Sequence, residues 1–234
     1  MNLLAIETST EACSVAVWVD GAVHARHELA PRRHTQLVLP WAEQLLAEAG
    51  IARTQLDAIA VGRGPGAFTG VRLAIAIAQG IALALDRPLL AVSTLAALAM
   101  RAEGGADGDR ILAAIDARMG EVYLGQFQRT PGGLVQAVSP EVIVPPAQAL
   151  LPATPVHGVG TGFSAESSAL VARLGNSLLG FDAAALPHAA DLARVAAAAW
   201  ERGEAIAPDA LEPAYLRDKV ALTLEEQGKP RPAL

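Results

Sequence analysis

The sequence is poor in cysteine and in aromatic residues. Cys13 is the only cysteine among 234 residues, which excludes an intramolecular disulfide and a cysteine-ligated metal cluster. This cysteine usage favours a reducing, cytoplasmic location, and the first ten residues lack the basic region and the long apolar run of a signal peptide. Aromatic residues make up 4% of the chain and hydrophobic residues 52%, so the core must consist mainly of Ala, Leu, Val and Ile.

The chain also has no excess of positive charge, and its histidines are not spaced as metal ligands. The net charge of −6 argues against nucleic-acid binding by the overall field of the chain, although a small basic patch stays possible. The five histidines are His24, His27, His34, His157 and His188. No two of them have the four-residue spacing that places two ligands on one helix face, so neither a zinc site nor metalloprotease chemistry is expected. The Gly-x-Ser-x-Gly elbow of a serine hydrolase is missing as well.

The glycine-rich stretch 62–70 lacks the lysine that a Walker A loop requires. The only Gly-Lys pair of the chain is Gly228-Lys229, far from this stretch, and no dinucleotide fingerprint is present. We therefore interpret 62–70 as a sharp turn from a strand into a packed helix. The free N–H groups at the start of such a helix could still attract an anion.

Residues 62–85 contain the most unusual feature, a run in which large and small apolar residues alternate. As a strand, roughly 16 residues would span about 50 Å, too far for a small domain. As a helix they span roughly 24 Å, but no side of that helix is polar. It must be buried all round, either inside the fold or partly by another protein. Arg72 and Gln79 interrupt the run, which falls short of ~20 apolar residues, so no membrane span is expected.

The remaining patterns predict two units that each begin with a hairpin and continue with alternating helices and strands. The predicted strands cover 2–6, 13–19, 22–29, 58–61, 89–92, 110–116, 121–128, 134–138, 142–144 and 156–159, and the predicted helices 35–49, 70–85, 94–102, 145–151, 165–174 and 188–202. The polar stretch 103–109 is the best boundary. We expect a first lobe over 1–105, a smaller second lobe over 106–216, and a loose tail over 217–234. The helix near 188–204 is placed so that it can pack back on the first lobe.

Two polar turns are candidates for chemistry. Glu7-Thr8-Ser9-Thr10 follows the first strand and resembles the first phosphate loop of actin-like ATPases and sugar kinases. Those families have aspartate and glycines there, whereas this chain has glutamate and no glycine, which weakens the case for ATP use. We interpret Asp116 and Arg118, at a strand end, as a structural pair or a rim contact and not as an acid and a base.

Five segments make the chain resemble the TsaB (YeaZ) family. They are LAIETSTEACSVAVW (4–18), HTQLVLP (34–40), DAIAVGRGPGAFTGVRLAIAIAQGIALAL (57–85), AIDARMGEVY (114–123) and EPAYLRD (212–218). The resemblance implies an α/β fold of the actin-like (ASKHA) class. This fold has two lobes, each with a mixed five-stranded-type sheet and flanking helices, and the second lobe is reduced.

The same resemblance implies a non-catalytic scaffold or activator in the formation of N6-threonylcarbamoyladenosine at position 37 of tRNAs that read ANN codons. Its expected partners are the catalytic subunit TsaD, which transfers the threonylcarbamoyl group, and the ATPase TsaE. Alone, the chain is expected to form a homodimer and to bind no cofactor, metal or membrane. It would reach tRNA only through the complex, and an ATP or ADP shared at the junction of subunits is left open.

The resemblance places the partner interface on the helices 35–49 and 70–85. The expected interface residues are Leu37, Val38, Trp41, Leu45, Arg72, Ile75, Ala78 and Gln79. The alternative function is an ATP-dependent phosphotransferase of the actin-like superfamily. Micromolar binding of ATP·Mg by the purified chain would favour that alternative.

Overall fold

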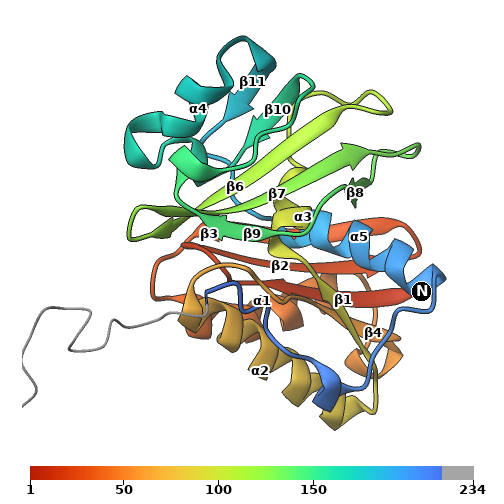
Figure 1. Cartoon of the computed structure of the whole chain (residues 1–234). Coiled ribbons are helices and arrows are strands. Elements are labelled where there is room, and N and C mark those ends of the chain that lie inside the picture. Colours follow the sequence, from red (N-terminus) through yellow and green to blue (C-terminus); the bar gives the residue numbers. More distant parts are fainter. Residues whose placement is uncertain (218–234) are drawn as a thin grey trace, which may run out of the picture.

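The computed structural model describes residues 1–217, which form two mixed sheets with flanking helices (Figure 1). The first sheet has the strand order β3-β2-β1-β4-β5. Its strands are β1 (Asn2–Glu7), β2 (Ala12–Val19), β3 (Ala22–Leu29), β4 (Ala58–Gly62) and β5 (Leu89–Val92). The hairpin strands β1, β2 and β3 are antiparallel, whereas β4 and β5 run parallel to β1.

The second sheet repeats this plan with the order β11-β10-β6-β7-β8, and β9 pairs with β7 beyond that path. Its strands are β6 (Arg110–Arg118), β7 (Glu121–Arg129), β8 (Val135–Ala137), β9 (Val142–Val144), β10 (Val156–Val159) and β11 (Leu178–Asp182). In both sheets the first strand is central, with its hairpin partner on one side and two parallel strands on the other. This arrangement confirms the predicted actin-like α/β fold.

Helices cover both faces of the first sheet. α1 (His34–Glu48) and α2 (Phe68–Leu85) pack on one face over a core of Leu, Ile and Val side chains. α5 (Ala189–Glu201) packs on the other face, against β1 and β2. The first sheet with α1, α2 and α5 is called the first lobe below.

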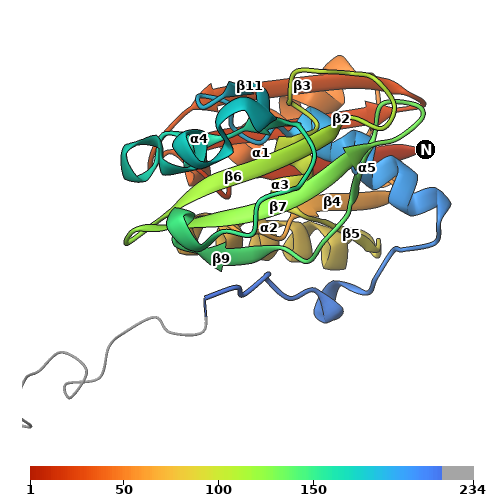
Figure 2. The same ribbon diagram turned by 45° about the horizontal axis from the view of Figure 1, so that its top comes forward.

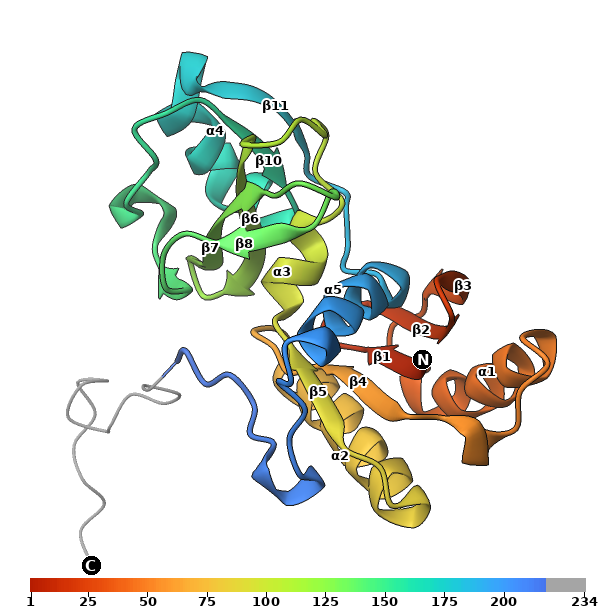
Figure 3. The same cartoon turned by 90° about the vertical axis from the view of Figure 1, so that its right-hand side faces the viewer.

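The second sheet with its helices is called the second lobe. It is reduced: only a 3₁₀ turn (Pro146–Gln148) stands between β9 and β10, and α4 (Ala169–Leu174) is short. α3 (Thr94–Ala99) packs on β6 and contacts α5, so these two helices lie between the sheets (Figure 3).

Three predicted elements differ from the structure, and one strand was not predicted. The helix predicted over 145–151 is the 3₁₀ turn, which ends where Ala149 leaves the helical backbone angles (φ −57°, ψ 133°). The helix predicted over 165–174 begins only at Ala169, since Ser167 and Ser168 have left-handed backbone angles. The helix predicted over 94–102 ends at Ala99, and β11 was not predicted at all. The tail predicted over 217–234 lies, except for Arg217, outside the described residues.

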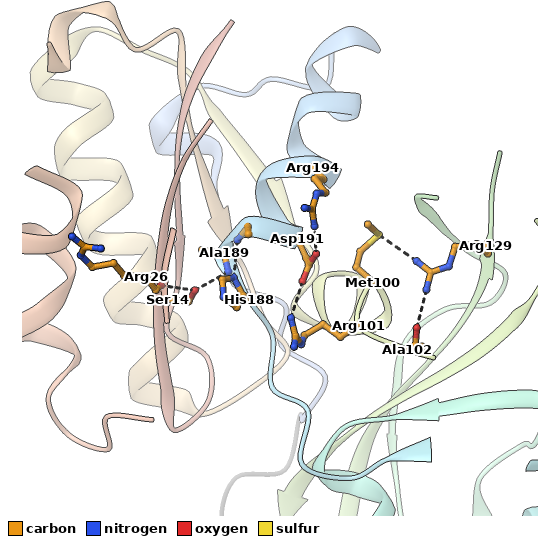
Figure 4. Close-up of polar contacts among 11 residues, drawn as sticks. Ser14, Arg26, Met100, Arg101, Ala102, Arg129, His188, Ala189, Asp191 and Arg194 are labelled. Atoms are coloured by element: carbon orange, nitrogen blue, oxygen red, sulfur yellow. Dashed lines mark hydrogen bonds and ion pairs between the residues drawn. The ribbon is translucent and has the colours of Figure 1, made fainter. Parts of the chain in front are cut away.

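Polar contacts join the start of α5 to its surroundings (Figure 4). The Ser14 hydroxyl on β2 accepts the Ala189 N–H at 2.9 Å. The Asp191 carboxylate, which is 6% exposed, pairs with Arg194 at 2.6 Å and with Arg101, just past α3, at 3.4 Å. These contacts fix α5 against both the first sheet and the segment that follows α3.

His188 caps the amino terminus of α5. Its Nδ1 accepts the Ala190 N–H at 3.0 Å, and its ring stacks on His27 with 4.6 Å between ring centroids. Burial lowers the pKa of His188 to about 4, and His27 adds to this effect. The fold therefore favours the neutral ring at this position.

His188→Asn is expected to flatten the acid dependence of stability. Because the folded pKa lies below the ordinary value of 6.5, the stabilisation is complete above pH 6.5 and is lost as the pH falls toward 4. Asparagine keeps a capping oxygen but does not titrate. Melting temperatures between pH 4 and 8 should fall more steeply for the unmodified chain than for the variant, and parallel curves would refute this assignment.

Candidate functional site

A cavity of about 560 Å³ lies between the two lobes. Its lining comes from the turn after β1, the start of α2, the β6–β7 hairpin and residues 213–217. Arg72, Arg118 and Arg217 supply positive charge, whereas Glu11 and Asp116 supply negative charge. The cavity is large enough for a small molecule.

The start of α2 packs directly against the turn after β1. The first turn of α2 lies so close to the turn after β1 that a Cβ atom added at Gly70 would come within 2.0 Å of the Thr8 carbonyl oxygen. The Ala67 N–H donates to the Ser9 carbonyl at 2.7 Å, so this N–H is also used. The glycines of 62–70 serve close packing, and the residues present do not form a phosphate cradle.

Glu7 is buried and fully engaged in hydrogen bonds. Its carboxyl group accepts the Ser9 N–H at 2.6 Å and the Thr94 hydroxyl at 3.1 Å. A Cβ atom at Gly62 would lie 2.0 Å from Oε2, which shows how tightly the group is enclosed. Burial raises the pKa of Glu7 above its ordinary value. Glu7 therefore joins β1 to the start of α3 instead of facing the cleft as a metal ligand.

Glu7→Gln is expected to stabilise the chain at neutral pH. Since the folded pKa is raised above the ordinary 4.5, ionisation of Glu7 costs stability as the pH rises from 4.5 toward the folded pKa. Glutamine has the shape of the protonated acid and never ionises. Its advantage in melting temperature should grow from pH 4.5 to 7, whereas Glu11→Gln, an exposed change in the same turn, should follow the unmodified chain. A pH-independent loss of stability in Glu7→Gln would contradict the prediction.

The other candidate ligands do not assemble into a metal site. Within residues 1–217, no group of three or more His, Cys, Asp or Glu side chains is arranged to hold a metal ion. Asp116 and Arg118 form an ion pair at 2.7 Å at the tip of the β6–β7 hairpin, as predicted.

The second candidate site is the surface of α2 that faces away from the sheet. The residues that α2 buries in the first-lobe core are Val71, Ala74, Ile75, Ala78 and Ala82. The outer face of α2 consists of the exposed residues Thr69, Ala76, Gly80, Leu83 and Ala84 and the partly exposed Leu73. Leu83 is 68% exposed, and Gly80 and Ala76 are exposed beside it. Within residues 1–217, α2 is therefore not buried on every side, and cover by another protein is the alternative that the sequence left open.

α2 also has the length and apolar composition of a membrane-spanning helix. Length and composition alone are weak grounds, because core helices of globular proteins meet the same criteria. Here one side of α2 packs on β4 and shares a core with α1.

The eight predicted interface residues divide into three groups: four are buried, two are half-buried on α1, and two on α2 contact the carboxyl-terminal segment. Val38, Leu45, Ile75 and Ala78 are buried in the first-lobe core, at 0% to 6% exposure. Leu37 and Trp41 are half-buried on one side of α1.

Arg72 and Gln79 are occupied by the chain's own carboxyl-terminal segment. Gln79 Nε2 donates to the Pro208 carbonyl at 2.8 Å, and Arg72 Nη2 donates to the Tyr215 hydroxyl at 2.6 Å. The sequence did not single out the exposed residues of α2, because its alternating pattern is the same on every side of the helix.

Comparison with known proteins places these features in a family. Residues 25–223 match the family model described as TsaD, tRNA N6-adenosine threonylcarbamoyltransferase. The chain is 43% identical over 230 residues to the tRNA threonylcarbamoyladenosine biosynthesis protein TsaB of Escherichia coli (strain K12), covering 94% of this chain and 96% of that protein. It is 39% identical to the TsaB protein of Haemophilus influenzae, covering 94% and 95%. A Pseudomonas aeruginosa crystal structure described as similar to peptidase YEAZ is 47% identical with a TM-score of 0.84, covering 92% of this chain and 99% of that one.

Proposed function

Because the chain belongs to the TsaB (YeaZ) family, we propose that it is a non-catalytic scaffold and activator subunit for N6-threonylcarbamoyladenosine formation at position 37 of tRNAs that read ANN codons. In this proposal the chain pairs with TsaD, the subunit that transfers the threonylcarbamoyl group, and the ATPase TsaE joins the pair. It acts in the cytoplasm and reaches tRNA through the complex.

The observation that carries the proposal is the outer face of α2. Small residues recur every fourth position along it, at Ala76, Gly80 and Ala84, with Leu73 and Leu83 beside them. Residues four apart form one ridge on a helix surface, and small side chains there let the backbone of a second helix approach closely. A partner helix would bury Leu83, which is otherwise 68% exposed. Without TsaD, a second copy of the chain would cover the same face as a homodimer.

Two observations support a partner role over catalysis by this chain. The start of α2 packs closely on the turn after β1, where a Cβ atom at Gly70 would lie 2.0 Å from the Thr8 carbonyl oxygen, and this closeness leaves little room for a phosphate. In addition, residues 1–217 do not assemble a metal-ligand cluster. We therefore expect the isolated chain to bind no nucleotide. An ATP or ADP held jointly with a partner subunit is compatible with the proposal.

Reconstitution tests the proposal. The chain should co-purify with TsaD and TsaE, and the modified nucleoside, measured by mass spectrometry of digested tRNA, should form only when the chain is present. ATP·Mg should not bind to the isolated chain in calorimetry. Full modification without the chain would refute the scaffold role, and phosphotransfer by the chain alone would favour the alternative phosphotransferase.

A further inference from the structure

A carboxyl-terminal strap, defined as residues 206–217, runs back from the end of α5 past α2 (Figures 1 and 2, dark blue). Ile206 and Leu89 exchange two backbone hydrogen bonds of 2.9 Å, so the strap begins by pairing with the edge strand β5. Leu211 is 5% exposed and belongs to the first-lobe core. The bond from Gln79 to the Pro208 carbonyl ties the strap to α2. This first part of the strap is therefore fixed to the first lobe.

The strap then reaches the mouth of the cleft. The Ala214 N–H donates to the Arg63 carbonyl, in the turn before α2, at 2.8 Å. The Arg72 guanidinium lies 3.3 Å from the Phe68 ring centroid and 5.0 Å from the Tyr215 ring centroid, and it binds the Tyr215 hydroxyl. Stacking of a guanidinium on aromatic rings is favourable even at a partly exposed site. Tyr215 thus ties this part of the strap to α2 of the first lobe.

Two residues later the strap is held by the second lobe. Arg217 Nη2 donates to Glu121 Oε2 at 2.7 Å, to the Ala117 carbonyl at 3.1 Å and to the Arg118 carbonyl at 3.4 Å, all in the β6–β7 hairpin. The side chains of Arg217 and Glu121 are only 20% and 31% exposed. Charge-assisted bonds of this kind are stronger than those of freely solvated ion pairs.

We propose that the strap is a clasp that holds the two lobes closed over the cleft, with Arg217 and Glu121 as its releasable end. The cleft is lined by the strap itself, by the turn after β1 and by the hairpin, so separation of the lobes opens it to solvent. When Arg217 leaves the hairpin, Arg72 and Tyr215 remain stacked on the first lobe, and the clasp opens at one defined point. The clasp acts in the free chain, so its test is independent of partner binding.

Spin labels at Gln36→Cys and Ala172→Cys, exposed positions on α1 and α4, report the distance between the lobes by pulsed electron paramagnetic resonance. Arg217→Ala should raise the ratio of long to short distances about tenfold, the change expected when one charge-assisted hydrogen bond is lost. Arg118→Ala is the matched control, because the Arg118 side chain pairs with Asp116 inside the same hairpin. It should leave the distances unchanged.

Charge exchange provides a second readout. Glu121→Arg should open the lobes, and the double variant Glu121→Arg with Arg217→Glu should close them again. Circular dichroism must show that each variant is folded. If Arg217→Ala unfolds, Glu121→Gln takes its place, because it weakens the same ion pair from the other side. Unchanged distances in folded Arg217→Ala or Glu121→Gln would overturn the proposal, as would equal opening in Arg118→Ala.

Discussion

Leu83→Glu is expected to abolish binding of the TsaD partner while the chain stays folded. Leu83 is 68% exposed on the outer face of α2, so glutamate at this position stays hydrated in the free chain. In the proposed complex the same carboxylate would be buried against a partner helix without a counter-charge. Affinity should fall about 100-fold or more, as for a central hot-spot residue. Calorimetry with purified TsaD measures this loss, and formation of the modified nucleoside should fall with it.

Leu179→Glu is the matched control for this prediction. Leu179 is 60% exposed, close to the value of Leu83, but it lies on β11 at the edge of the second sheet. The control should bind TsaD normally, and both variants should melt at the temperature of the unmodified chain. The α2 interface would be refuted if Leu83→Glu bound TsaD as tightly as Leu179→Glu. Loss of binding in both variants would point to a wider surface instead.

The sequence predicted most of the fold because its longer elements carry strong local patterns. The alternation in 22–29 indicated a half-exposed strand near a sheet edge, and β3 is the edge strand of the first sheet. Short elements were less predictable. β11 has five residues with Gly180 in the middle, which weakens the strand pattern. Left-handed backbone angles at Ser167 and Ser168 interrupt a segment that otherwise looks helical.

The candidate site was predicted as a pair of helices with eight interface residues on them. These residues could not be sorted into core and surface from the sequence, because which side of α2 faces the sheet depends on the path of β4 and the turn before Phe68. The predicted interface therefore grouped Ile75 and Ala78, which face the core, with partly exposed positions. Arg72 and Tyr215 are 143 residues apart in sequence, and local periodicity contains no sign of such a contact. The EPAYLRD segment was recognised only as part of the family resemblance, and the structure gives its Tyr215 and Arg217 a place at the cleft.

Leu45 is the clearest case of a predicted interface residue that lies in the core. Its variants are therefore expected to destabilise the fold, whether or not a partner is present. Leu45 is 0% exposed and packs with α2 and the first sheet in one core. Leu45→Ala should lower the free energy of unfolding by about 3 kcal/mol through lost burial and a new cavity. Leu45→Glu should unfold the chain, because an unpaired carboxylate would enter an apolar core.

Leu39→Ala is the control on the same helix. Leu39 is 48% exposed, so its truncation should change the free energy of unfolding by less than about 1 kcal/mol in urea titrations. A loss below about 1 kcal/mol for Leu45→Ala would mean that Leu45 is not a core residue. If Leu45→Ala shows the expected loss in free energy of unfolding, failure of Leu45→Glu to bind TsaD would reflect unfolding. It would then say nothing about contact between Leu45 and the partner. Only substitutions on the outer face of α2, such as Leu83→Glu, separate docking from folding.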